Sequence, residues 1–224
     1  MTTTKPRKRT ATKAAAPYHH GNLPQALVAA TIAIIEERGV EHVSVREAAR
    51  RAGASPAAPF RHFANKSALL TAVAEQAMDR LKIAVDAAVC ASVRAKPLAR
   101  LEALGAAYLA WALQNPTHFQ IISSRSLIDV AASERIGPAN DAIRAVMAGL
   151  IAEAQADGSC DPDLDIDQVV LMTRAFGYGL ARMAIDGHLP EWHPSEPVGE
   201  AVPKALRLFM SLLTAKPRQQ ARGP

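Results

Sequence analysis

The stretch that decides the fold is GASPAAPFRHF, residues 53–63, which holds two prolines three residues apart, two alanines and then a group of aromatic and basic side chains. Ser55 is a favourable N-cap, and Pro56 at the first helical position loses nothing, because the N–H there has no partner inside a helix. Pro59 removes one early hydrogen bond and crowds the Ser55 carbonyl. We therefore predict a short helix that Ser55 caps and that begins sharply at Pro56.

Two further helices precede this stretch. Apolar residues recur at helical spacing between Leu23 and Gly39, and the glycine ends that helix. The segment SVREAARRAG begins with Ser44 as N-cap and places Glu47 three residues later, which is the pattern of a capping box. Its alanines allow the next helix to cross closely, so residues 44–63 predict a helix-turn-helix.

The rest of the chain also predicts helices. Of its 224 residues, 49% are hydrophobic and only 4% aromatic, and no alternating strand pattern persists, which indicates an all-α fold of about nine helices. A long helix starts at Lys66, and later helices are expected at Pro97–Gln114, Pro116–Ser123, Gly137–Ala156, Ile166–Asp186 and Gly199–Thr214. We divide the chain into a disordered basic tail (1–20), a helix-turn-helix head (21–81), a helical body (82–216) and a disordered tail (217–224).

The charge is distributed unevenly along the chain. Residues 1–66 hold 11 Lys or Arg and 4 Asp or Glu, whereas the whole chain holds 26 and 21. The N-terminal part of the chain is therefore basic and the remainder mildly acidic. This distribution predicts that an anionic partner binds at one end of the protein. Two unpaired cysteines, no signal-peptide pattern and no long apolar run predict a cytoplasmic protein that does not enter a membrane.

The arrangement resembles the TetR family of bacterial transcriptional regulators. The resemblance covers residues 18–73, from YHHGNLPQALVAATIAIIEERG to VSVREAARRAGASPAAPFRHFANKSALLTAV, with the breaks at Gly39 and Gly53 and the ending F-R-H-F-x-x-K. YHHGNL and YLAWALQNPTHFQII resemble the subgroup with a WHG-type C-terminal domain. That subgroup carries Trp and His where this chain has Arg174 and Tyr178.

The predicted head meets DNA through small and basic side chains. Ala57 and Ala58 allow the backbone to approach base edges, and Arg46 has the fork geometry for a guanine or a phosphate. Helix starts add N–H groups, and the resemblance gives Lys66 a phosphate contact. Phe60 replaces the family's usual tyrosine, a loss of roughly 0.5–1.5 kcal/mol per site. The predicted DNA-binding residues are Ser44, Arg46, Ser55, Pro56, Ala57, Ala58, Phe60, Arg61, His62 and Lys66.

The body is expected to bind a small apolar effector and to hold a homodimer. Apolar stripes on the last two long helices imply, by the resemblance, a dimer interface, so that two heads read a palindromic operator. The aromatic residues predicted to line a ligand cavity are Trp111, Phe119, Phe176 and Tyr178. These features favour a ligand-responsive repressor.

The sequence leaves two alternative functions open. The chain could be a constitutive or protein-partnered DNA-binding regulator without a small-molecule ligand. An enzyme is the other class, but no nucleophile, Walker or Rossmann motif occurs, and we predict neither a cofactor nor a metal site. Asp161, Asp163, Asp165 and Asp167 are spaced like a calcium loop but lack its glycine and its final glutamate. We predict that Asp165 instead caps the following helix.

Overall fold

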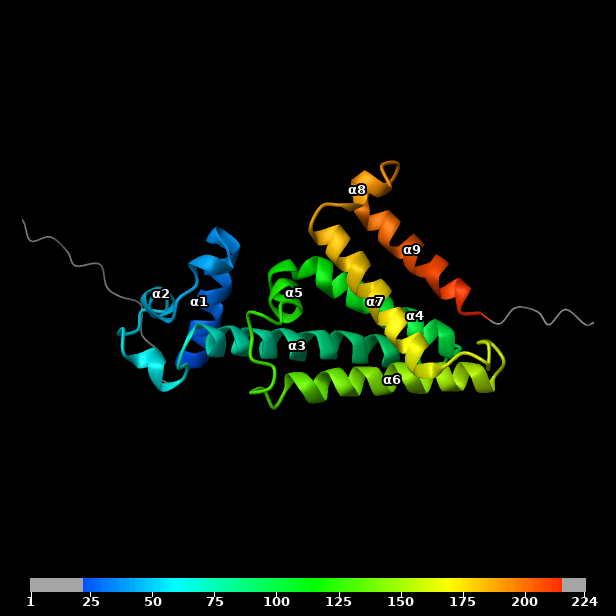
Figure 1. Cartoon of the computed structure of the whole chain (residues 1–224), viewed down its shortest axis with the longest axis horizontal. Helices are drawn as coiled ribbons and strands as arrows, with labels where there is room; N and C mark the ends of the chain where they lie inside the picture. The colour runs from blue at the N-terminus through cyan, green and yellow to red at the C-terminus, as the bar shows by residue number, and fades with distance from the viewer. Residues whose placement is uncertain (1–21, 215–224) are drawn as a thin grey trace, which may run out of the picture.

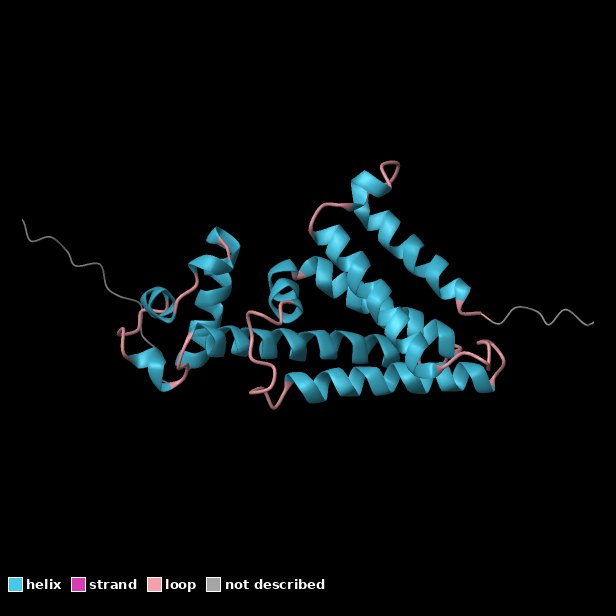
Figure 2. Ribbon diagram, in the orientation of Figure 1, coloured by secondary structure: helices cyan, strands magenta, loops and turns pink. Residues whose placement is uncertain are grey.

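The computed structural model describes residues 22–214, and in this range the chain consists of helices joined by loops (Figure 2). The helices are α1 (Leu23–Arg38), η1 (Val40–His42), α2 (Val45–Arg51), η2 (Ala58–Arg61), α3 (Lys66–Ala91), α4 (Pro97–Gln114), α5 (Pro116–Ser123), α6 (Ile136–Ala156), α7 (Ile166–Ile185), α8 (Leu189–Trp192) and α9 (Val198–Leu212). Between residues 22 and 214 the only β-type pairing is an isolated bridge from Cys160 to Thr214. The all-α prediction is confirmed; the tails predicted at 1–20 and 217–224 lie outside the described residues.

Local signals place most helix starts. The Ser44 hydroxyl accepts a hydrogen bond from the Glu47 N–H at 3.1 Å, which starts α2 as predicted. Asp165 accepts from the Gln168 N–H at 2.9 Å, so its carboxylate caps α7. Prolines open α4 and α5, where a missing N–H costs no intrahelical bond. The four-residue helix α8 lies in a segment that we expected to be a plain loop.

The prediction of a helix that Ser55 caps and that begins at Pro56 was wrong. Residues 56 and 57 form a turn, Ala58–Arg61 is a 3₁₀ helix, and Ser55 does not cap it. The Ser55 carbonyl accepts from the Ala58 N–H three residues on, at 3.1 Å. The residue four positions on is Pro59, which has no N–H to continue an α-helix. The prolines therefore convert this helix into a turn followed by one 3₁₀ segment.

The helices form a small head and a larger body that share α3 (Figure 1). The head consists of α1, α2 and η2 around the start of α3, at one end of the molecule. The rest of α3 packs against α4, α5 and α6, while α9 lies on the outer side of the bundle. With 26 residues α3 is about 39 Å long, and the domain boundary that we predicted at residues 81/82 falls inside it.

A single apolar core runs through both parts. It extends from Leu27 in α1, through Leu69 and Val73 at the start of α3, to Leu206 in α9. These four side chains are at most 4% exposed. Because the core is continuous, the orientation of the head depends on the packing of α3 in the body.

Candidate functional site

Most of the predicted DNA-binding residues are exposed on the surface of the head. Eight of the ten are exposed, and Ala58 and Lys66 are half-buried. Pro59 and Phe63 point inward and are buried in the head. Phe60 is 47% exposed, so its ring is available to a partner. This surface combines small residues with aromatic and basic ones, and its positive charge suits an anionic partner.

The arginines of the head fall into two groups. Arg51 binds Glu37 through two hydrogen bonds, one of them 2.7 Å long, and Arg50 binds Glu47 at 2.8 Å. Arg38 also binds Glu47 at 2.7 Å, and the hydrogen bonds from Arg50 and Arg38 lower the Glu47 pKa from 4.5 to about 2. The Arg51–Glu37 and Arg38–Glu47 pairs join α1 to α2, Arg50 is paired within α2, and all three arginines are therefore already paired.

Arg46 and Arg61 form the second group. Both are exposed, and neither has an acidic partner within residues 22–214. An arginine without a carboxylate partner keeps its full charge for phosphates or base edges. Sequence periodicity could not show that Arg51 is paired with Glu37, because that carboxylate lies on another helix.

Lys66 has a structural contact that the sequence did not indicate. Its ammonium donates to the carbonyl of Val40 at 2.6 Å and to that of Glu41 at 3.3 Å. The start of α3 is thereby tied to η1. The phosphate contact of Lys66 stays a prediction; an ammonium has three protons, and these two contacts leave one for a further acceptor.

A cavity of about 490 Å³ lies in the body between α3, α4, α6 and α7. Buried apolar side chains form its interior; on α3 these are Met78, Leu81 and Val85, each at most 5% exposed. Its volume falls in the range of small-molecule sites, roughly 300–1,000 Å³. The cavity therefore has the size and lining of an effector site.

Charged groups also line the cavity. Arg125, Arg144 and Arg174 line it together with a single carboxylate, Asp167. Arg174 donates to the Tyr108 hydroxyl at 2.7 Å, and its guanidinium lies 5.0 Å from the centre of that ring. Burial raises the pKa of Tyr108 although Arg174 opposes this, so the hydroxyl stays protonated. The cavity therefore combines a largely apolar lining with a net positive charge.

Of the four aromatic residues predicted for the ligand, only Phe176 lines this cavity. Trp111 and Phe119 are 7% and 0% exposed and belong to the core. Tyr178 lies 5.9 Å from Phe119, ring centre to ring centre, and outside the cavity lining. The sequence analysis did not identify Tyr108 and Thr173 as cavity-lining residues. The available signal for a polar site was Arg174, a charged residue among the apolar residues in the middle of α7.

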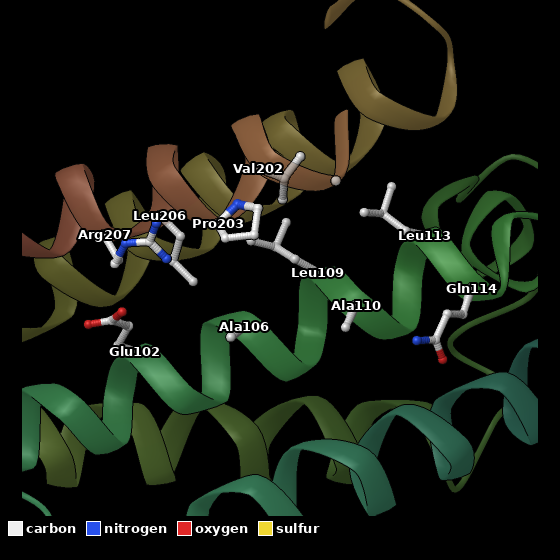
Figure 3. A pocket seen from close by; sticks show the side chains of 11 residues that line it. Glu102, Ala106, Leu109, Ala110, Leu113, Gln114, Val202, Pro203, Leu206 and Arg207 are labelled. Atoms are coloured by element: carbon white, nitrogen blue, oxygen red, sulfur yellow. The ribbon is translucent and has the colours of Figure 1, made fainter. Parts of the chain in front are cut away.

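A second hollow of about 310 Å³ lies between α4 and α9 (Figure 3). Leu109 of α4 and Leu206 of α9 lie in the space between the two helices and line both hollows. Gly105 is close to this partition, because a Cβ added there would lie 3.2 Å from Leu206 Cδ1. Two leucines therefore separate the hollow from the larger cavity.

Large apolar side chains of α7 and α9 remain exposed: Leu171, Met172, Leu208 and Leu212, which are 56–73% exposed, and of these Leu171 also lines the large cavity. Much of the stripe that we predicted for a dimer packs within the chain instead. Phe176 stacks on Phe209 at 4.3 Å between ring centres, and Leu180 is buried. A Cβ added at Gly179 would meet no atom within 4 Å, so that side of α7 is open.

Comparison with known proteins identifies the chain. Residues 27–73 match the family "Bacterial regulatory proteins, tetR family", and residues 101–212 match "Tetracyclin repressor-like, C-terminal domain". This chain belongs to the TetR family. It is a DNA-binding transcriptional regulator with a helix-turn-helix head, as its residues predicted.

Solved structures support the assignment of the TetR fold. A Rhodococcus sp. RHA1 protein of unknown function is 32% identical, with a TM-score of 0.72 over 89% of this chain and 99% of its own. A TetR-family regulator from Shewanella sp. PV-4 is 22% identical, with a TM-score of 0.65 over 87% and 100%. The ketosteroid regulator KstR2 of Mycobacterium tuberculosis is 20% identical, with a TM-score of 0.63 over 89% and 98%. No curated protein matches significantly.

Between residues 22 and 214 no three His, Cys, Asp or Glu side chains cluster as a metal site would require. Within that same range, no helix has the length and apolar character needed to span a bilayer. The structural relatives named above as regulators share the fold of this chain and are transcription factors by name.

Proposed function

We propose that this TetR-family protein is a ligand-responsive repressor that binds a near-palindromic operator as a homodimer in the cytoplasm. One observation carries the proposal: α3 belongs to both functional parts. Its start, at Lys66, is tied to the head, and Met78, Leu81 and Val85 form a wall of the cavity. A molecule that fills the cavity therefore acts on the helix that positions the head.

The DNA-binding step uses the unpaired cations of the head. Arg46 and Arg61 contact base edges or phosphates, and Ala57 and Ala58 allow the backbone to lie close to the major groove. Phe60 packs on sugar and base but donates no hydrogen bond. Arg51 of α2 binds Glu37 and Arg38 of α1 binds Glu47, and these two pairs hold α2 against α1 and keep this face in position.

The dimer uses the outer faces of α7 and α9. Leu171, Met172, Leu208 and Leu212 are exposed on them, and burial of such side chains contributes about 1.5–3 kcal/mol each. Gly179 permits a close approach by a partner helix. Two heads related by a twofold axis then reach half-sites about 34–36 Å apart, one turn of DNA.

Release from the operator follows from a population shift. The ligand favours an arrangement of α3 in which the two heads no longer fit successive major grooves. The helix α5 is a second connection between the body and the head, since it packs against both α3 and α1. Burial and the charge of Arg80 lower the pKa of His118 in α5, and this imidazole lies 3.4 Å from the Arg80 guanidinium.

The decisive experiment is selection of bound fragments from the organism's own genome, followed by footprinting. We expect a near-palindromic footprint on one face of the duplex. Arg46→Ala should weaken operator binding by about 1–3 kcal/mol for each base that the arginine recognises. Arg94→Ala, an equally exposed arginine beyond the far end of α3, is the matched control and should bind like wild type. A selection that enriches no duplex over random competitor refutes the proposal.

Ligand response is tested separately. The protein on its operator is screened by fluorescence anisotropy against a library of small hydrophobic molecules, and a true effector lowers DNA affinity in a saturable way. A reporter gene with the operator over its promoter should be silent until that effector is added. A regulator that binds its operator tightly but releases it for no compound is the constitutive alternative.

A further inference from the structure

The cavity in the body contains a polar atom that the protein itself leaves without a partner. Thr173 lines the cavity and is 9% exposed, and its Oγ1 has no hydrogen-bond partner within residues 22–214. A buried hydroxyl without a partner costs about 1–3 kcal/mol. Such an atom in a cavity wall is satisfied when an occupant brings an acceptor or a donor.

Other threonines of this chain show that a position inside a helix does not leave the hydroxyl without a partner. Thr31 Oγ1 donates to the Leu27 carbonyl at 2.7 Å, and Thr71 Oγ1 donates to the Ser67 carbonyl at 2.8 Å. Both use the carbonyl four residues earlier, the usual choice for threonine in a helix. Thr173 does not make this bond, so its buried hydroxyl is left without a partner in the wall of the cavity.

The charges that line the cavity are mostly positive, three arginines against one carboxylate. Of the three arginines that line it, Arg144 has an acidic neighbour, Asp167, at 3.7 Å. Arg125 and Arg174 have no acidic partner in the described part of the chain, and Arg174 is held by the hydroxyl of Tyr108. A positioned guanidinium offers two parallel N–H groups that match the geometry of an oxyanion.

We infer that the cavity binds an amphipathic oxyanion: an alkyl or other apolar body between α3, α4 and α6, with a carboxylate, phosphate or sulfate headgroup at Arg174 and Arg125. Met78, Leu81 and Met147 surround the apolar body, and each is at most 5% exposed. The Thr173 hydroxyl donates to an oxygen of the occupant. This inference names the ligand class of the proposed effector site and rests on that proposal. It replaces the purely apolar effector that the aromatic residues suggested.

The charge of the headgroup decides the binding. Equilibrium dialysis of the full-length protein, without DNA, compares four probes with the same ten-carbon chain below their micelle concentrations: decanoate, decyl phosphate, decan-1-ol and decyltrimethylammonium. Decanoate or decyl phosphate should bind saturably and at least tenfold more tightly than the alcohol, and the cation should bind most weakly. The better of the two anions identifies the headgroup. Equal binding of alcohol and anions, or a preference for the cation, overturns the inference.

Variants assign the binding to these residues. Arg174→Met should weaken anion binding by about ten- to a hundredfold, the loss of a charged hydrogen bond, and leave decan-1-ol binding unchanged. Arg207→Met, which changes an exposed arginine at the other hollow (Figure 3), should bind decanoate like wild type. An Arg174→Met protein with wild-type anion affinity refutes the assignment.

Thr173→Val provides a second readout that does not depend on Arg174. Removal of the unpartnered hydroxyl should raise the melting temperature of the free protein and weaken anion binding about two- to tenfold. A variant that binds anions as well as wild type contradicts the role given to Thr173. Circular dichroism of each variant confirms that it is folded.

Operator release is measured on the same samples and separates the two proposals. Anion binding that leaves operator affinity unchanged supports the ligand class and refutes the ligand response. Release of the operator by a neutral or cationic compound, without anion binding, supports the ligand response and refutes the oxyanion site.

Discussion

Lys66→Met tests the contact between the head and α3 in the greatest detail. The Lys66 ammonium donates to the Val40 carbonyl at 2.6 Å and to the Glu41 carbonyl at 3.3 Å. Water can replace the ammonium at the exposed Glu41, so we count only the Val40 bond. A hydrogen bond from a charged donor contributes about 1.5–3 kcal/mol. Removal of this bond should therefore make local opening of the head about ten to a hundred times more frequent.

Native-state hydrogen exchange followed by mass spectrometry measures this opening. Peptides from residues 39–52 should exchange faster by that factor in Lys66→Met, while peptides from α6 and α7 should not change. Lys82→Met is the matched control, because Lys82 lies on the same helix in a surface pair with Asp86, which contributes little. Unchanged exchange at residues 39–52 would refute the contact as a source of stability. If Lys66 also binds a phosphate, the variant lowers the salt slope of operator binding by about 0.9 per contact.

The remaining predictions concern stability. Phe119→Ala removes a fully buried ring that lies 6.1 Å from Tyr108 and 5.9 Å from Tyr178; it should cost about 3–5 kcal/mol in urea unfolding, and a cost below about 1 kcal/mol would show that Phe119 is not a core residue. The Glu47 pKa is lowered from 4.5 to about 2, so its ion pairs stabilise the fold above about pH 4.5 and lose this contribution as the pH falls toward 2. Unfolding followed by circular dichroism between pH 2 and 5 should therefore be less pH-dependent for Glu47→Gln, and identical acid profiles would contradict this.

Most helix boundaries could be predicted because they depend on neighbouring residues. Ser44 and Asp165 bind N–H groups three residues on, Pro97 and Pro116 open helices, and Gly39 ends one at a φ of +90°. The same reasoning was wrong at Ser55. A cap there requires an α-helix behind it, and Pro59 removes the N–H that this helix would use.

The functional residues could be predicted only where the local sequence pattern determines which side chains are exposed. The predicted head residues lie on an accessible face, but their sequence neighbours Arg50 and Arg51 are paired with carboxylates. The aromatic residues of the body show the limit of the method. Helical spacing marks Phe119 and Phe176 as apolar positions alike, yet one is fully buried in the core and the other lines the cavity.

The sequence alone determined that this chain is helical, where most of its helices begin and end, and that a basic helix-turn-helix head precedes a larger body. These properties depend on hydrogen bonds and caps between residues at most four positions apart. Only the tertiary structure decided which cations are free, which side chains line the cavity, and that Arg174 meets Tyr108 from 66 positions away. Periodicity shows which face of a helix is apolar, but the partner of that face depends on how distant helices pack together.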